Sequence, residues 1–237
     1  MFFEKLIECD DLPKTSQINE YRWEQTFSRH VKNGDTVVAI VISSKLSGTY
    51  ANARRAAKKF GEKVFVVDSL NACIGERILF NYAIRLKDEN KDAEEIFHLL
   101  ESAKNRVRVL ALLGTLKYLK KGGRISPLVA FVGETLNMKP VVGIVNGEVK
   151  LIGKAIGSKK GNNLINTLIK NGRGLDFSMP FTTGYSGLDD TVIKKYIEDS
   201  KNIWEGQTDA VPVFEIGSTI GTHVGPGAIA VAFFEKE

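Results

Sequence analysis

The segment Thr36–Tyr50, TVVAIVISSKLSGTY, constrains the fold of this 237-residue chain more than any other stretch. An apolar run, Val37–Ile42, is followed by a turn of hydroxyl-bearing side chains and then by a segment of helical character up to Phe60. A buried parallel strand, a polar turn and a helix start together form a site that can hold an anion, because the first helical amides point outward unpaired. Ser47 is predicted to cap the helix, and its hydroxyl can also face a ligand.

The motifs of several common enzyme sites are missing. Neither GxxxxGK[ST] nor GxGxxG occurs at the turn, so the sequence does not support a nucleotide site. No G-x-S-x-G elbow is present to make Ser47 a hydrolase nucleophile, and no acidic residue is placed to orient His223. The sequence also lacks HExxH and any His/Cys/Asp cluster that would indicate a metal site. A small anion such as a carboxylate fits the turn better.

Strand-like and helical segments alternate over the first half of the chain. Short apolar strands are predicted at Lys63–Val67 and Arg106–Leu113, with amphipathic helices between them. This alternation predicts a doubly wound parallel sheet, in which Arg106–Leu113 is a third strand. Loops that bind ligands lie at the carboxyl ends of such strands, so we expect the turns 43–49 and 68–72 to share one edge of the sheet.

The pattern changes near residue 115. Helices are predicted at Thr115–Lys121 and Val129–Leu136, and Asn146-Gly147 between two apolar runs is a strong hairpin signal. The second half therefore contains antiparallel pairing. The predicted fold class is α/β with two domains: a three-layer α/β/α domain with a parallel sheet at residues 1–114, then a two-layer mixed-sheet α/β domain at 115–237.

Net charge and cysteine content limit the possible partners of the protein and its cellular compartment. The net charge of +5 leaves two interpretations open, an anionic partner or a basic surface that keeps the protein in solution; the scattered lysines favour the second. Cys9 and Cys73 lie far apart in unlike contexts, which argues against a disulfide and indicates a reducing cytoplasm. No apolar stretch approaches the roughly 20 residues of a membrane span, and no signal peptide is visible.

Two of the three histidines, His30 and His98, lie in amphipathic helices and are predicted to be on the surface or at its boundary with the core. The third, His223, lies in Gly221–Gly227, which is predicted to be a rigid glycine-rich loop; it either faces a ligand between the domains or is bonded to backbone. Arg124 follows two glycines, and either supplies positive charge near a carboxylate or phosphate or is an ordinary surface arginine.

Five motifs, in this order, resemble those of the DegV family of fatty-acid-binding proteins: ISSKLSGTYANARRAA, VVDSLNACIG, LKYLKKGGRIS, LNMKPVVGIVNGEVKLIGKAIGSKKG and IGTHVGPGAIAVAF. The resemblance extends from about Phe2 to Phe234. It implies a protein that holds one long-chain fatty acid in a buried tunnel and presents its carboxylate to a separate fatty-acid kinase, which brings ATP and makes acyl-phosphate. It thus implies a lipid-binding protein rather than an enzyme, with no cofactor besides the bound fatty acid.

The resemblance also implies roles for four residues. Thr15, Ser47 and His223 would bind the fatty-acid carboxylate, and Arg124 would lie behind them or on the surface that faces the kinase. The implied partners are a long-chain fatty acid and the kinase, in the cytoplasm; peripheral membrane contact is compatible with this, and a nucleic acid is not expected.

One departure from the family pattern concerns the start of the chain. Family members usually begin with a buried strand and a Thr-Asp-Ser-type loop, and neither precedes the helix that ends near Leu12. Such a strand would lie beside Val37–Ile42, so part of the tunnel wall is expected to be missing here. Two other functions stay open: a dihydroxyacetone-kinase-like enzyme that uses His223 on a small substrate, and a basic module that binds nucleic acid or membrane.

Overall fold

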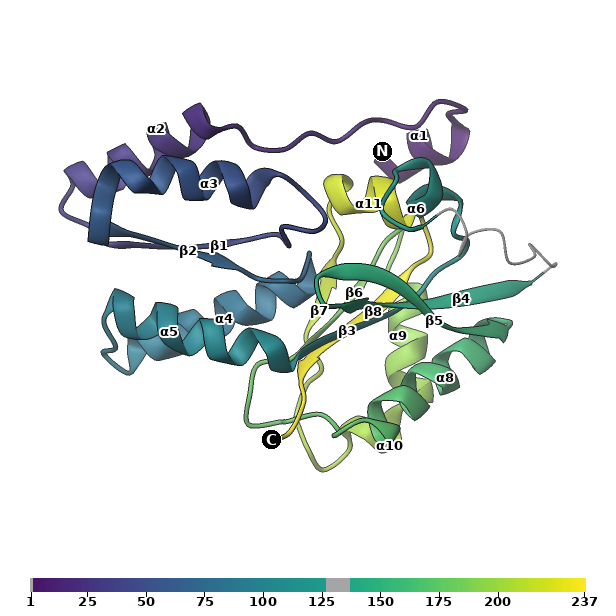
Figure 1. Ribbon diagram of the computed structural model, residues 1–237. Helices are drawn as coiled ribbons and strands as arrows, with labels where there is room; N and C mark the ends of the chain where they lie inside the picture. Colours follow the sequence, from purple (N-terminus) through teal and green to yellow (C-terminus); the bar gives the residue numbers. More distant parts are fainter. Residues whose placement is uncertain (1, 127–136) are drawn as a thin grey trace.

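The computed structural model describes residues 2–126 and 137–237 and shows two β-sheets with helices around them (Figure 1). The first half of the chain contributes α1 (Phe2–Glu8), α2 (Glu20–Lys32), β1 (Val37–Val41), α3 (Thr49–Ala57), η1 (Lys58–Lys63), β2 (Val64–Asp68), α4 (Ile74–Asp88), α5 (Ala93–Ala103), η2 (Lys104–Arg106) and β3 (Val107–Leu112). The second half contributes α6 (Lys117–Lys121), β4 (Met138–Val145), β5 (Glu148–Ile156), α8 (Ser158–Asn171), β6 (Thr182–Tyr185), α9 (Thr191–Asp199), α10 (Lys201–Trp204), β7 (Val213–Glu215), α11 (Ser218–Val224) and β8 (Ile229–Phe234). The helix predicted at Val129–Leu136 lies outside the described residues.

The smaller sheet is a parallel pair with helices on both faces. Strands β1 and β2 pair in register from Val37 opposite Val64 to Val41 opposite Asp68. Helices α2 and α3 cover one face and α4 and α5 the other, which confirms the predicted three-layer α/β/α arrangement (Figure 1). Ala53 and Ala56 of α3 are fully buried, because side chains this small allow the helix to approach the sheet closely.

The larger sheet has the strand order β5-β4-β3-β8-β6-β7 within the described residues and mixes parallel with antiparallel pairing. The prediction that Arg106–Leu113 is a third parallel strand of the first sheet was wrong. Strand β3 pairs antiparallel with β4 on one side and with β8 on the other. A local apolar pattern reports that a strand is buried but not which strands flank it. The domain boundary after residue 114 stays a prediction, and β3 of the larger sheet lies before it.

The hairpin predicted at Asn146-Gly147 is confirmed. Strands β4 and β5 pair antiparallel up to Val145 opposite Glu148. Asn146 and Gly147 both have positive φ, 52° and 84°, which matches the turn type that suits the twist of a two-residue hairpin.

Helix α4 lies between the two sheets and joins them into one core. It contacts β1 of the smaller sheet and β3, β8 and β6 of the larger one. Alternate residues of β8 pack on opposite faces of the larger sheet. Ala230, Ala232 and Phe234 belong to the core on the side of α4. Val231 and Phe233 belong to the core under α8 and α9. The alanines leave room between the sheets, and that room is where the candidate site lies.

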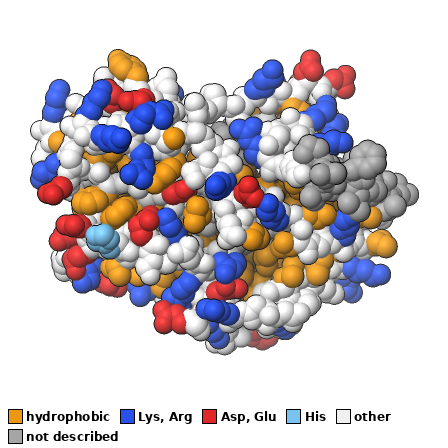
Figure 2. Space-filling view, in the orientation of Figure 1, with side chains coloured by type: hydrophobic (Ala, Val, Ile, Leu, Met, Phe, Trp, Pro, Cys, Tyr) orange, Lys and Arg blue, Asp and Glu red, His pale blue; other side chains and the backbone are white. Residues whose placement is uncertain are grey.

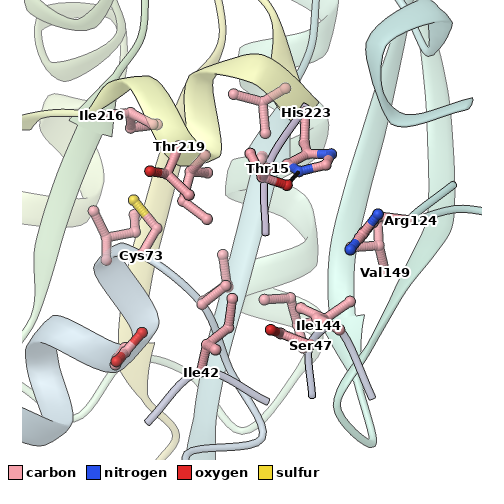
Figure 3. A pocket seen from close by; sticks show the side chains of 18 of the residues that line it. Thr15, Ile42, Ser47, Cys73, Arg124, Ile144, Val149, Ile216, Thr219 and His223 are labelled. Atoms are coloured by element: carbon pink, nitrogen blue, oxygen red, sulfur yellow. Dashed lines mark hydrogen bonds between the residues drawn. The ribbon is translucent and has the colours of Figure 1, made fainter. Parts of the chain in front are cut away.

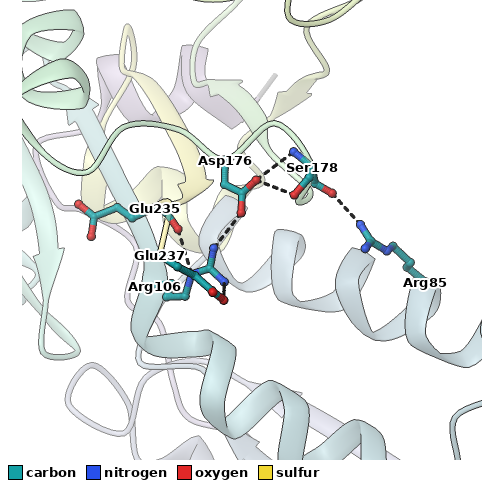
Figure 4. A network of polar contacts seen from close by, with 6 residues as sticks. All are labelled: Arg85, Arg106, Asp176, Ser178, Glu235 and Glu237. Carbon is teal, nitrogen blue, oxygen red and sulfur yellow. Dashed lines mark hydrogen bonds and ion pairs between the residues drawn. The ribbon is translucent and has the colours of Figure 1, made fainter.

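A network around Arg106 ties the end of the chain to the larger sheet (Figure 4). Its guanidinium donates to Asp176 Oδ2 at 2.8 Å, to the Glu235 carbonyl at 2.9 Å and to Glu237 Oε1 at 2.9 Å. Ser178 donates to Asp176 as well. Burial raises the pKa of Asp176, but the bonds from Ser178 and Arg106 outweigh it, so the pKa of this carboxyl lies below its usual value.

Arg106→Ala is expected to lower the free energy of unfolding by about 1–3 kcal/mol at pH 7, because it leaves the partly buried Asp176 and a strand-end carbonyl without this donor. A lowered pKa means that Asp176 contributes stability above its unfolded pKa and loses it as the pH falls. The difference from wild type should therefore shrink toward pH 3. Urea unfolding at the two pH values measures this, with Arg173→Ala on the exposed surface as the control. An equal loss at both pH values would contradict the role given to Asp176.

Candidate functional site

A cavity of about 490 Å³ lies between the two sheets (Figure 3). Its walls come from β1 and the turn after it, the start of α4, strands β3, β4, β5 and β8, and helix α11. Most of the lining is aliphatic, as in Ile40, Ile42, Val109, Ala111, Val142 and Ala230. A volume of this size suits a small organic ligand, and walls of this kind favour an apolar one.

The two polar turns predicted at strand ends do share one edge of the smaller sheet. The Ser43 amide donates to the Asn71 carbonyl at 2.8 Å, and the Ser44 amide donates to Asp68 Oδ1 at 3.1 Å. The Ser43 hydroxyl also donates to the carbonyl of Gly147, in the hairpin of the other sheet, at 2.7 Å. The turn after β1 is therefore held from both sheets, which gives its side chains fixed positions at the cavity.

Ser47 lines the cavity, but the prediction that it caps the following helix was wrong by one residue. The N-cap of α3 is Gly48. The Ser47 hydroxyl accepts from the Thr49 amide at 3.2 Å and lies 2.9 Å from the Thr49 hydroxyl. Thr49 Oγ1 in turn accepts from the amide of Ile18 at 3.2 Å, which attaches the segment that carries Thr15 to this turn.

Thr15 and His223 meet across the cavity, 208 residues apart in sequence (Figure 3). Thr15 Oγ1 lies 2.8 Å from His223 Nε2. The prediction that Gly221–Gly227 is a loop was wrong in part, because His223 lies in the last turn of α11. Burial, and then the positive charge of Arg124, lower the pKa of His223 below its ordinary value. Both effects favour the neutral form of the imidazole.

Arg124 lines the same cavity at its exposed end and donates to the Gly122 carbonyl at 2.6 Å. The structure thus brings all four residues named from the sequence to one cavity, although only Thr15 and His223 are bonded to each other. In Figure 3, Arg124 and Ser47 lie toward one side of the cavity and Cys73 and Ile216 toward the other.

Glu76 was missed from the sequence, where a glutamate in an amphipathic helix indicates a surface position. It lies in the first turn of α4 and lines the cavity. Burial raises the pKa of its carboxyl to about 7, and no hydrogen bond or ion pair joins it to another described residue. Cys73, which precedes α4 with φ of 54°, also lines the cavity, and burial raises the pKa of its thiol to about 11.

The remaining expectations concern surface and metal chemistry. His30 and His98 are exposed, as predicted, with 45% and 68% of their side-chain surface accessible. Figure 2 shows Lys and Arg mixed with Asp and Glu over this face rather than gathered in one patch, which agrees with the second interpretation of the net charge. Across the described residues no three His, Cys, Asp or Glu side chains gather as a metal site would require. Nor does any helix in that part of the chain have the length and apolarity to cross a bilayer.

A family model described as "Uncharacterised protein, DegV family" matches residues 1–236. The chain belongs to the DegV family. A DegV domain-containing protein of Clostridium perfringens is 31% identical over 243 residues, which cover 98% of this chain and 80% of that protein. The DegV domain-containing protein YteA of Lactococcus lactis is 32% identical over 226 residues, covering 92% of this chain and 76% of that one.

Solved DegV structures share the fold. A DegV family protein from Thermus thermophilus, whose structure is described as showing fatty acid binding, has a TM-score of 0.83 at 27% identity. The match covers 99% of this chain and 83% of the Thermus chain. A DegV lipid binding protein from Thermotoga maritima has a TM-score of 0.85 at 25% identity. The match covers 100% of this chain and 83% of the Thermotoga chain. These likenesses confirm the family and the α/β fold class predicted from the sequence.

Proposed function

We propose that this DegV protein binds a long-chain fatty acid in the cavity between its sheets, with the carboxylate held by Thr15, Ser47 and His223. The observation that carries the proposal is an apolar cavity into which hydroxyl and imidazole groups from three distant segments project. The hydroxyls of Thr15 and Ser47 can donate to a carboxylate, and the imidazole of His223 acts through its bond to the Thr15 hydroxyl. The DegV structures from Thermus thermophilus and Thermotoga maritima support the same class of ligand.

The aliphatic walls supply the affinity in this proposal. Burial of an acyl tail contributes about 0.8 kcal/mol per methylene, so a chain of many carbons gains far more from the walls than from its head group. The polar cluster then decides which end of the ligand lies where. Arg124, exposed at the same opening, adds positive charge near the carboxylate without a direct bond to Thr15 or His223.

The proposal includes a role as the lipid-binding partner of a fatty-acid kinase rather than as an enzyme. The sequence resemblance implies that partner, and the opening beside Arg124 is the surface we assign to it. The alternative, an enzyme with His223 as nucleophile, has less support from the geometry. His223 Nε2 is engaged by Thr15, and Nδ1 is buried, so neither ring nitrogen is free to attack a substrate.

Native mass spectrometry of the full chain tests the proposal. Protein purified from bacterial cells should carry a mass of one long-chain fatty acid, and delipidated protein should take up one oleate. Protein that carries no lipid and takes up neither oleate nor palmitate would overturn it. Mixing the loaded protein with a fatty-acid kinase and ATP, and measuring acyl-phosphate, tests the partner separately.

Ser47→Ala is expected to weaken oleate binding roughly 3- to 10-fold, the effect of losing one hydrogen bond to a ligand. The Ser47 amide still donates to the Ser43 carbonyl in this variant, whereas the contacts of the lost hydroxyl with the amide and the hydroxyl of Thr49 are removed. Ser44→Ala is the matched control, at an exposed position three residues earlier in the same turn. Fluorescent fatty-acid displacement measures both, and equal affinities in the two variants would remove Ser47 from the site.

A further inference from the structure

The two ring nitrogens of His223 have different surroundings. Nε2 lies 2.8 Å from the Thr15 hydroxyl oxygen. Nδ1 is buried, and none of the described residues offers it a hydrogen-bond partner. It faces Gly122 instead, because a β-carbon built on Gly122 would lie 2.2 Å from Nδ1. Gly122 is the residue that ends helix α6, and Arg124 donates to its carbonyl.

This contact decides where the single proton of a neutral imidazole lies. In the direction of a β-carbon, glycine carries only a hydrogen, so a Gly122 C–H group points at Nδ1. A C–H group suits a nitrogen lone pair and would collide with an N–H. A second proton, on both nitrogens, is opposed by burial and by the charge of Arg124.

We infer that Gly122 holds His223 as the Nε2–H tautomer, and that this sets the Thr15 hydroxyl as a donor into the cavity. Nε2–H donates to Thr15 Oγ1, so the hydroxyl hydrogen of Thr15 is left for a ligand. With the opposite tautomer, Thr15 would donate to Nε2 and turn its lone pairs toward the ligand. A site of this polarity takes an ionised acyl carboxylate in preference to a fatty alcohol, whose hydroxyl can itself donate.

The inference rests on the proposed fatty-acid site and gives Gly122 the part of a positioning residue, since it acts on the ligand through His223 and Thr15. Gly122→Ala is expected to displace the ring, break its contact with Thr15 and lower oleate affinity at least 10-fold. Gly123→Asn is the matched control. Gly123 has φ of 68° and open space where a β-carbon would lie, and asparagine tolerates this backbone region.

Long-range ¹H–¹⁵N correlation spectra of the full chain with ¹⁵N-labelled histidine test the inference directly. The His223 signals, assigned by their loss in His223→Gln, should be those of the Nε2–H tautomer at pH 7, both without ligand and with oleate. In Gly122→Ala they should shift, whereas in Gly123→Asn they should stay. Wild-type oleate affinity should exceed that for oleyl alcohol by more than 10-fold.

An Nδ1–H tautomer or an imidazolium at pH 7 in the oleate complex would overturn the inference. So would a Gly122→Ala variant with unchanged His223 signals and unchanged oleate affinity. If Gly122→Ala does not fold, the wild-type spectrum and the comparison of oleate with oleyl alcohol still test the inference. Failure of the proposed function gives a different result, which is a wild-type protein that takes up no oleate whatever its tautomer.

Discussion

Thr15→Val is expected to lower the affinity for oleate about 10- to 100-fold, because it removes a hydroxyl that we place against an ionised carboxylate. A hydrogen bond to a charged group is worth about 1.5–3 kcal/mol, roughly twice a neutral one. Valine keeps the shape of threonine, so the walls of the cavity stay unchanged. The loss also leaves His223 Nε2 without its partner at 2.8 Å, which adds to the effect. Isothermal titration of delipidated protein with oleate measures it.

Two further variants make the Thr15 experiment specific. Thr15→Ser keeps a hydroxyl and should retain most of the affinity. Thr26→Val removes a hydroxyl that donates to the Arg22 carbonyl on α2, away from the cavity, and should leave binding at the wild-type value. Oleate affinity that is equal in Thr15→Val and Thr26→Val would place the carboxylate elsewhere.

Glu76→Gln is expected to stabilise the protein at pH 8 and to have little effect at pH 4. Burial raises the pKa of Glu76 from 4.5 to about 7 in the folded chain. Below pH 4.5 the carboxyl is neutral in both the folded and the unfolded state, so it costs nothing. As the pH rises toward 7 and beyond, the folded protein must hold the charge in an apolar wall. Its free energy of unfolding then falls by up to about 3 kcal/mol relative to the value at low pH. Glutamine stays neutral throughout and avoids this loss.

Thermal unfolding at the two pH values measures the Glu76 effect. A gain near 3 kcal/mol corresponds to a melting temperature higher by about 6–12 °C for a chain of this size. Glu62→Gln, on the exposed surface, is the control and should change neither value. A gain in Glu76→Gln that is the same at pH 4 and pH 8 would show that the effect does not come from the buried charge.

Local pattern predicted the strands of this protein better than their partners. The segment 36–50 forms the strand, turn and helix start that its residues indicated, and the Asn146-Gly147 hairpin forms as expected. Strand β3 was correctly located, yet it belongs to the larger sheet. Both of its faces are buried in either arrangement, so its apolar residues are the same. One of its partners, β8, lies more than 100 residues further along the chain, and no local pattern reports a pairing of that kind.

The site shows the same division. Hydroxyls at a strand end and a histidine among glycines were visible as candidate ligands in the sequence. Two details depended on neighbours in space: His223 ends a helix rather than lying in a loop, and its Nδ1 faces Gly122. Glu76 was missed because its place in an amphipathic helix is typical of a surface residue, whereas α4 lies between the two sheets and Glu76 lines the cavity there.

The sequence by itself determined the strand, the polar turn and the helix start at 36–50, and the binding of an anion at that turn stays a prediction. Its motifs also determined the DegV family. The tertiary structure decided what that turn faces. Two sheets with α4 between them enclose an apolar cavity and bring Thr15, Ser47 and His223 to it. The physical reason is that a turn's chemistry is local, whereas an enclosed cavity exists only where distant segments pack and leave space between them.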